Sequence, residues 1–180
     1  MELLAETSLA ADHKPHCATP AGVSGRRKPL YTPEERRRRD ESRWTLVQGV
    51  LAPLQFLVFL VSLALVVRFL LTGAGEAAAT VSILVKTAIL YTIMVTGAIW
   101  EKVVFGKYLF APAFFWEDVF SMLVIALHTA YVVMLVRGIG SVDQQMAVAL
   151  AAYAAYVINA GQFLWKLRMA RLDAQAEASA

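Results

Sequence analysis

The chain has 180 residues, of which 58% are hydrophobic and only 17% are charged, and its formal net charge is +3. A soluble domain is nearer half apolar and about a quarter charged, so this composition excludes a water-facing surface over most of the chain. Nine of the 17 basic residues and seven of the 14 acidic residues precede Trp44, which indicates an integral membrane protein with a polar N-terminal arm. The remaining basic residues flank apolar runs, and this distribution argues against nucleic-acid binding.

Residues 1–29 make up the arm, and we expect them to be disordered because they are rich in small, proline and charged residues without periodicity. Two early acidic residues and the lack of an uninterrupted apolar core argue against a signal peptide. His13, His16 and Cys17 lie close together, but three ligands in an unstructured segment do not preorganise a metal site. Cys17 is the single cysteine, so an internal disulfide is excluded.

The stretch from Thr32 to Glu35 is typical of a helix start, with a threonine N-cap, a proline at the first helical position and acids in the first turn. The helix it opens carries four consecutive arginines, Arg36 to Arg39. We expect a short, solvated juxtamembrane helix whose basic residues can rest on anionic lipid headgroups.

Four apolar runs follow, and each is long enough to cross the ~30 Å hydrocarbon core of a bilayer. They predict an all-α, four-helix transmembrane bundle with spans at about 44–70, 77–100, 113–136 and 143–165. The second span is interrupted only by Lys86, and a loop of about 101–112 follows it. We therefore expect one membrane domain over residues 30–172 and a C-terminal tail over 173–180.

The distribution of basic residues predicts the orientation of the bundle. The arm is strongly basic, the 101–112 loop carries Lys102 and Lys107, and the last span is followed by three further basic residues. The two turns at the other end have only Arg68 and Arg137 at their edges. Both termini and the 101–112 loop should therefore be cytoplasmic.

The third span carries a polar stripe at helical spacing, formed by Glu117, Ser121, Val124, His128 and Tyr131. Glu117 and His128 are separated by three turns, so they point within about 20° of each other, with the imidazole roughly 16 Å deeper. In lipid, a helix turns such residues toward other helices or a cavity. His128 has no capping role at mid-span and could be a structural hydrogen-bonding group, an acid or base, or a metal ligand.

Residues also share faces on the other spans: Gln48 with Gln55, Lys86 with Gly97 and Glu101, and Tyr156 with Asn159 and Gln162. The amides are more typical of hydrogen bonds between helices than of reactants. Lys86 could extend to the far interface, pair with an acid, or bind a ligand. Glu117 and Asp118 could be acids that favour a helix N-terminus. The aromatic residues of the loop could form an interface belt or the rim of a site for a flat ligand; these are Phe105, Tyr108, Phe110, Phe114, Phe115 and Trp116.

Three strings extend this interpretation: LVQGVLAPLQFLVFLVSLALV (46–66), YTIMVTGAIWEKVVFGKYLFAPAFFWEDVFSMLVIALHTAY (91–131) and AAYAAYVINAGQFLWKLRMARL (151–172). They resemble the 3-vinyl bacteriochlorophyllide hydratase family of bacteriochlorophyll biosynthesis, the BchF type. The resemblance runs from about Leu30 to Leu172, and residues 1–29 have no counterpart in it.

The resemblance implies a carbon–oxygen lyase that adds water across the C3 vinyl group of chlorophyllide a or of 3-vinyl bacteriochlorophyllide a, giving a 1-hydroxyethyl group. It implies no redox cofactor, and a location in the bacterial inner, intracytoplasmic photosynthetic membrane, with other bacteriochlorophyll-synthesis enzymes as partners. A competing interpretation is a non-enzymatic tetrapyrrole carrier or assembly factor of that membrane. A small transporter subunit fits less well, because the four spans show no repeat and no broken helix pair.

Within this expectation, the sequence suggests roles for the charged residues. Glu117 and Glu101 are the leading candidates for general acid and base, with Asp118 third, because a carboxylic acid kept neutral by burial can donate a proton. His128 could ligate the substrate's Mg axially or act as the base, and the protein would need no metal of its own. The propionate of the substrate would seek Lys102 or Lys107, and the further candidates for substrate binding are Lys86, Tyr131, Tyr156, Asn159 and Gln55.

Overall fold

The computed structural model describes residues 30–178, which contain five helices and no strand. The helices are α1 (Pro33–Glu41), α2 (Arg43–Thr72), α3 (Glu76–Phe105), α4 (Phe115–Arg137) and α5 (Val142–Ala178). The expectations of a disordered arm and of no metal site at its histidines fall on residues 1–29, outside the described part of the chain.

The predicted helix start is confirmed at α1. The Thr32 side chain accepts a hydrogen bond from the Glu35 backbone N–H, and the Glu35 carboxylate accepts one from the Thr32 N–H, which is a complete capping box. Ser42 adopts an extended conformation that ends α1, and its hydroxyl caps α2. The place of α1 beside a membrane stays a prediction.

The expected all-helical architecture is confirmed, since α2 to α5 are each long and apolar enough to cross a membrane. Large apolar side chains also cover the outer surface, among them Leu57, Val61 and Trp165, as a lipid environment requires. The orientation of the bundle in the membrane stays a prediction.

One predicted boundary is wrong. The helix α3 continues through Glu101 to Phe105, so the loop covers residues 106–114, because Glu101 is buried on the inner face and Lys102 donates to the Gly106 carbonyl at the C-terminus of α3. The helix α5 runs on to Ala178, so residues 173–178 of the expected C-terminal tail are helical. Alanine and long-chain residues of high helix propensity prevail there.

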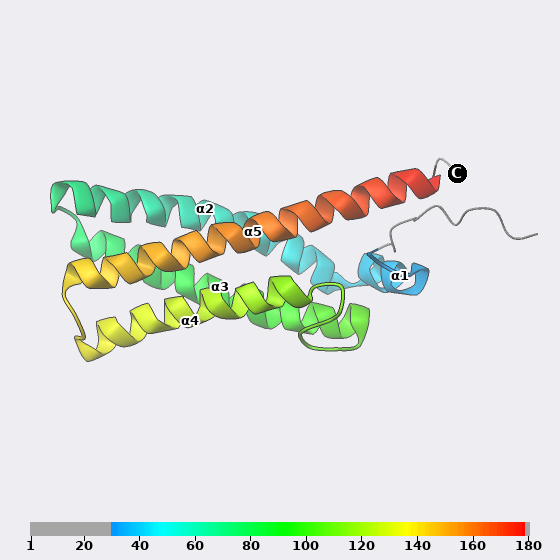
Figure 1. Cartoon of the computed structure of the whole chain (residues 1–180), viewed down its shortest axis with the longest axis horizontal. Coiled ribbons are helices and arrows are strands. Elements are labelled where there is room, and N and C mark those ends of the chain that lie inside the picture. The colour runs from blue at the N-terminus through cyan, green and yellow to red at the C-terminus, as the bar shows by residue number, and fades with distance from the viewer. Residues whose placement is uncertain (1–29, 179–180) are drawn as a thin grey trace, which may run out of the picture.

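The four long helices form two antiparallel hairpins, α2 with α3 and α4 with α5 (Figure 1). One end of the bundle, here called the loop end, carries α1, the 106–114 loop and the last turns of α5. The opposite end carries the two tight connections between hairpin partners. Gly73 and Gly138 close α2 and α4 there with positive φ, a conformation that glycine adopts without steric cost.

The loop end is closed by an aromatic cluster, which divides the aromatic residues of the loop into two groups. Phe105 and Phe114 pack with Tyr31, Trp100 and Phe163, with ring centroids 5.7–6.4 Å apart. Burial raises the pKa of the Tyr31 hydroxyl, although the Arg39 guanidinium lies over its ring and opposes this shift. The remaining loop aromatics are exposed, namely Tyr108, Phe110, Phe115 and Trp116.

Candidate active site

Three carboxyl groups are buried together at the loop end of the bundle. Glu101 comes from α3, Glu117 and Asp118 come from the first turns of α4, and their exposed fractions are only 6%, 6% and 3%. Glu117 and Asp118 face inward because α4 begins immediately after the buried Phe114. Burying three ionisable carboxyl groups together costs free energy, and such clusters are typical of functional sites.

Glu101 and Asp118 hold the 106–114 loop by its backbone. Asp118 Oδ2 accepts a hydrogen bond of 2.6 Å from the Phe110 N–H, and Glu101 Oε2 accepts one of 3.3 Å from the Ala111 N–H. Phe110 itself has φ 58°, in the left-handed region that non-glycine residues rarely adopt. Both acids therefore have a structural role in addition to any chemical one.

Glu101 and Asp118 also lie close enough for their side chains to interact with each other, and a hydrogen bond is the interaction open to them. Two carboxyl groups can make such a bond only when one of them carries a proton, because an ionised carboxylate has no donor. The pair is thus arranged as a proton store on the inner side of the loop. Glu117 lies within electrostatic range of both members.

Glu117 has a different partner, Lys166 of α5. The Lys166 ammonium lies 2.6 Å from Glu117 Oε2, donates to the Ala113 carbonyl, and faces the Phe114 ring at 5.0 Å from its centroid. This is a charge-assisted hydrogen bond in which Glu117 is the carboxylate. The site therefore places two neighbouring carboxyl groups beside a carboxylate held by a cation.

Lys166 is a site residue that the sequence analysis missed. In the sequence, Lys166 is the first basic residue after a charge-free run, a position typical of a residue that marks the end of a membrane span. A usable signal was its place four residues after Gln162, on the same helical face as Asn159 and Gln162.

The predicted stripe on α4 is confirmed, since Glu117, Ser121, Val124, His128 and Tyr131 are all buried. Ser121 accepts a 2.8 Å hydrogen bond from the amide of Asn159, which joins α4 to α5 between the loop end and His128. Asn159 therefore fits the interpretation of a hydrogen bond between helices.

His128 lies deeper in the bundle and is fully buried. Its Nδ1 is 2.8 Å from the Val124 carbonyl oxygen, so Nδ1 is the donor and Nε2 carries the lone pair. Among the described residues, no group hydrogen-bonds to Nε2. A histidine whose tautomer is fixed by a backbone carbonyl and whose other nitrogen is free can ligate a metal.

Lys86 of α3 lies near His128 and is also fully buried. Its ammonium lies 4.0 Å from the centroid of the Tyr156 ring, and the ring of Tyr153 contacts both Lys86 and His128. Gln55 on α2 is buried too, and neither of its side-chain polar atoms has a hydrogen-bond partner within residues 30–178. The predicted site residues thus fall into two groups, one at the loop end and one in the middle of the bundle.

Lys102 and Lys107 belong to neither group, because both are exposed at the loop end. The Lys102 ammonium donates to the Gly106 carbonyl and lies over the Tyr108 ring.

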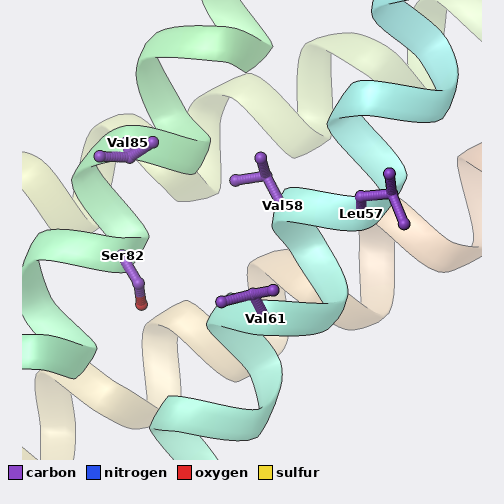
Figure 2. Close-up of a pocket in the computed structure, with 5 residues that line it drawn as sticks. All are labelled: Leu57, Val58, Val61, Ser82 and Val85. Atoms are coloured by element: carbon purple, nitrogen blue, oxygen red, sulfur yellow. The ribbon is translucent and has the colours of Figure 1, made fainter.

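Two shallow grooves open on the outer surface of the bundle. Figure 2 shows the groove between α2 and α3, of about 270 Å³, lined by Leu57, Val58, Val61, Ser82 and Val85. Its single hydroxyl, that of Ser82, hydrogen-bonds to Ser62 and to the Ala79 carbonyl, so this groove offers no acid or base. The second groove, of about 240 Å³, lies between α2 and α5 and includes Phe59 and Tyr153.

Comparison with known proteins gives a consistent result. The family model described as 2-vinyl bacteriochlorophyllide hydratase matches residues 31–169. A protein of that name from Cereibacter sphaeroides is 70% identical over 157 residues, which cover 87% of this chain and 98% of the relative. A second, from Rhodobacter capsulatus, is 74% identical over 151 residues, which cover 84% and 88%. No solved structure matches the chain.

Proposed function

The chain belongs to the 2-vinyl bacteriochlorophyllide hydratase family, and we propose that the buried carboxyl groups at its loop end carry out the hydration. The protein is a hydratase, a carbon–oxygen lyase of bacteriochlorophyll biosynthesis, and its substrate is a bacteriochlorophyllide. The 2-vinyl group of the family's name and the C3 vinyl group are the same substituent under two numbering schemes of the macrocycle.

One observation supports the proposed site above all: Glu101 and Asp118 lie beside each other, both buried, while Glu117 is paired with Lys166. Hydration of a vinyl group needs a proton donor and a proton acceptor in the same site. The carboxyl pair supplies the donor, and the Glu117 carboxylate supplies the acceptor. This assignment makes Glu117 the base and places the proton on the Glu101–Asp118 pair.

The reaction follows in two steps. The carboxyl pair transfers its proton to the terminal vinyl carbon, and the positive charge that develops on the adjacent carbon is delocalised into the macrocycle. Water then adds to that carbon while Glu117 accepts its proton. Return of this proton from Glu117 to the Glu101–Asp118 pair restores the starting state, so the net change is the addition of one water.

The substrate would approach from the bilayer, since it is a flat, largely apolar macrocycle. His128 can take its Mg as an axial ligand through the free Nε2. The distance of roughly 16 Å between His128 and Glu117 along α4 exceeds that from the centre of a tetrapyrrole to its edge, so the Mg must leave His128 and the macrocycle must shift toward the loop end before the vinyl group reacts. Tyr131, Tyr156, Asn159 and Gln55 would line its path.

The four apolar helices indicate a multi-pass membrane protein. We place it in the inner, intracytoplasmic photosynthetic membrane with both termini and the 106–114 loop in the cytoplasm, where the basic residues of α1 can contact anionic lipid. Other enzymes of bacteriochlorophyll synthesis would then have access to the loop end.

A mass measurement tests the proposed site. Membranes that contain the protein should convert the vinyl substrate to a product heavier by one water. Glu117→Gln and Glu101→Gln should each lower the rate by about 100-fold or more, the usual contribution of a general acid or base. Glu34→Gln, on the exposed face of α1, is the matched control and should react normally. Wild-type rates in both Glu117→Gln and Glu101→Gln would exclude the proposed site.

A further inference from the structure

We infer that Lys86 binds the carboxylate of the tetrapyrrole substrate inside the bundle, through an entrance between α2 and α5. This inference rests on the proposed function, because it names the substrate group that Lys86 holds. It also replaces Lys102 and Lys107, the two lysines that the sequence suggests for this role.

Lys86 is a buried lysine without a counter-ion in the described part of the chain. It lies ten residues, or about 15 Å, from the start of α3, and its side chain is fully buried. Its ammonium makes no hydrogen bond or ion pair with any residue between 30 and 178. It therefore neither extends to the interface nor pairs with an acid. A lone charge at membrane depth is costly and is typical of a ligand site.

Aromatic rings hold the Lys86 ammonium in place. It lies 4.0 Å from the centroid of Tyr156, 5.4 Å from that of Tyr153 and 5.9 Å from that of Phe59. Cation–π contacts of this kind stabilise a desolvated ammonium, but they leave its N–H donors without acceptors. An anionic oxygen acceptor is the group that completes this site.

The entrance to Lys86 that we propose is the surface groove beside two of these rings. Phe59 and Tyr153 also line the groove between α2 and α5, whose other walls are apolar and face outward. The Tyr153 hydroxyl is fixed by a hydrogen bond to Ser62, so opening a path from this groove to Lys86 requires the Phe59 ring to turn. A groove of about 240 Å³ is below the usual size of a pocket for a whole organic ligand, and it suits one edge or substituent of a macrocycle.

The charge around Lys86 favours a carboxylate. The titratable group of another helix within electrostatic range is His128, and the two other ionisable side chains nearby are the tyrosines of α5. No acid from residues 30–178 pairs with Lys86 to compete with the ligand. With His128 on the Mg and Lys86 on the carboxylate, α3 and α4 would each hold the substrate at one point.

The surface lysines are poorer candidates. Lys102 already donates to the Gly106 carbonyl, and both Lys102 and Lys107 are exposed, where water and salt weaken an ion pair. The buried ammonium of Lys86 would gain more from the same carboxylate, because it is already stripped of water.

The experiment compares binding of the free acid with binding of its methyl ester. The full chain with Glu117→Gln, in detergent, is titrated with each pigment and binding is followed by fluorescence, so that turnover does not interfere. The protein with Lys86 intact should bind the acid roughly 30-fold tighter than the ester, the loss expected when one partner of a buried charge pair is removed. Equal binding of acid and ester would overturn the inference without any Lys86 variant.

Lys86→Met should weaken binding of the acid to the level of the ester and leave binding of the ester unchanged, whereas Lys86→Arg should keep the preference. The matched controls Lys102→Met and Lys107→Met should keep it as well. An equal loss for both pigments in Lys86→Met would show a structural role and contradict the inference. Normal hydration by Glu117→Gln would count against Glu117 as the base. The comparison of acid and ester would then be made with the hydrated product, which carries the same carboxylate, so the test of Lys86 is separate from that of the reaction site.

Discussion

Glu117 of α4 and Lys166 of α5 form an ion pair of 2.6 Å that joins two helices across the loop end of the bundle. The Glu117 side chain is almost completely buried, whereas the Lys166 side chain is about one-quarter exposed. Lys166 also donates to the Ala113 carbonyl, so one ammonium positions both the proposed base and the residue before the aromatic Phe114.

The first prediction is that Lys166→Met lowers the hydration rate by about tenfold or more, because the Glu117 carboxylate loses the donor that orients it. Lys166→Arg should retain much of the activity, since a guanidinium can donate to the same carboxylate. Initial rates in membranes with matched protein content measure both effects.

A double variant separates positioning from a wider structural role. If Lys166 acts through Glu117, then Glu117→Gln with Lys166→Met should be no slower than Glu117→Gln alone. Independent losses that multiply in the double variant would contradict the role of Lys166 as a positioning residue.

The second prediction distinguishes the chemical role of Glu101 from its hold on the loop. Glu101→Gln keeps a carbonyl oxygen that can accept from the Ala111 N–H, but it removes the carboxyl proton shared with Asp118. We expect a rate about 100-fold lower with little change in the melting temperature of the protein in detergent. Glu101→Ala should lose both activity and stability. If both variants lose stability but keep their activity, the role of Glu101 is to anchor the 106–114 loop.

The polar stripe of α4 could be predicted from the sequence because one helix decides it. Residues three and four apart share a face whatever the rest of the fold does, so Glu117 and His128 were certain to point the same way. The pair Glu117–Lys166 could not be predicted, because its members are 49 residues apart and meet only through the packing of α4 on α5.

Helix ends were harder to predict for a related reason. Glu101 and Lys102 mark the end of an apolar run, and a charge in that position commonly ends a span. Here the buried carboxylate of Glu101 belongs to the inner face, so α3 passes through it for another turn. Tertiary contacts also set the left-handed backbone of Phe110, for which a phenylalanine gives no signal.

The third prediction concerns Phe110, whose φ of 58° costs a non-glycine residue about 1 kcal/mol or more. Phe110→Gly should raise the stability of the protein by about 1 kcal/mol, less a small loss from the contact with Phe115, whose ring centroid is 5.7 Å away. Tyr108→Gly is the matched control, since Tyr108 is exposed and has ordinary φ; it should lower stability. Thermal unfolding in detergent measures both, and a destabilised Phe110→Gly would show that the ring, not the backbone, decides this position.

The last prediction tests His128 as the ligand of the substrate's Mg. Its free Nε2 and fixed Nδ1–H suit coordination, so the protein should bind a Mg-containing bacteriochlorophyllide more tightly than the same macrocycle without metal. His128→Ala should abolish that preference, because the coordinate bond is lost for the Mg pigment alone. The absorption spectrum of the bound Mg pigment should also shift between the protein with His128 and the variant. If His128→Ala weakens binding of both pigments equally, His128 is a packing residue of the bundle and the Mg finds its axial ligand elsewhere.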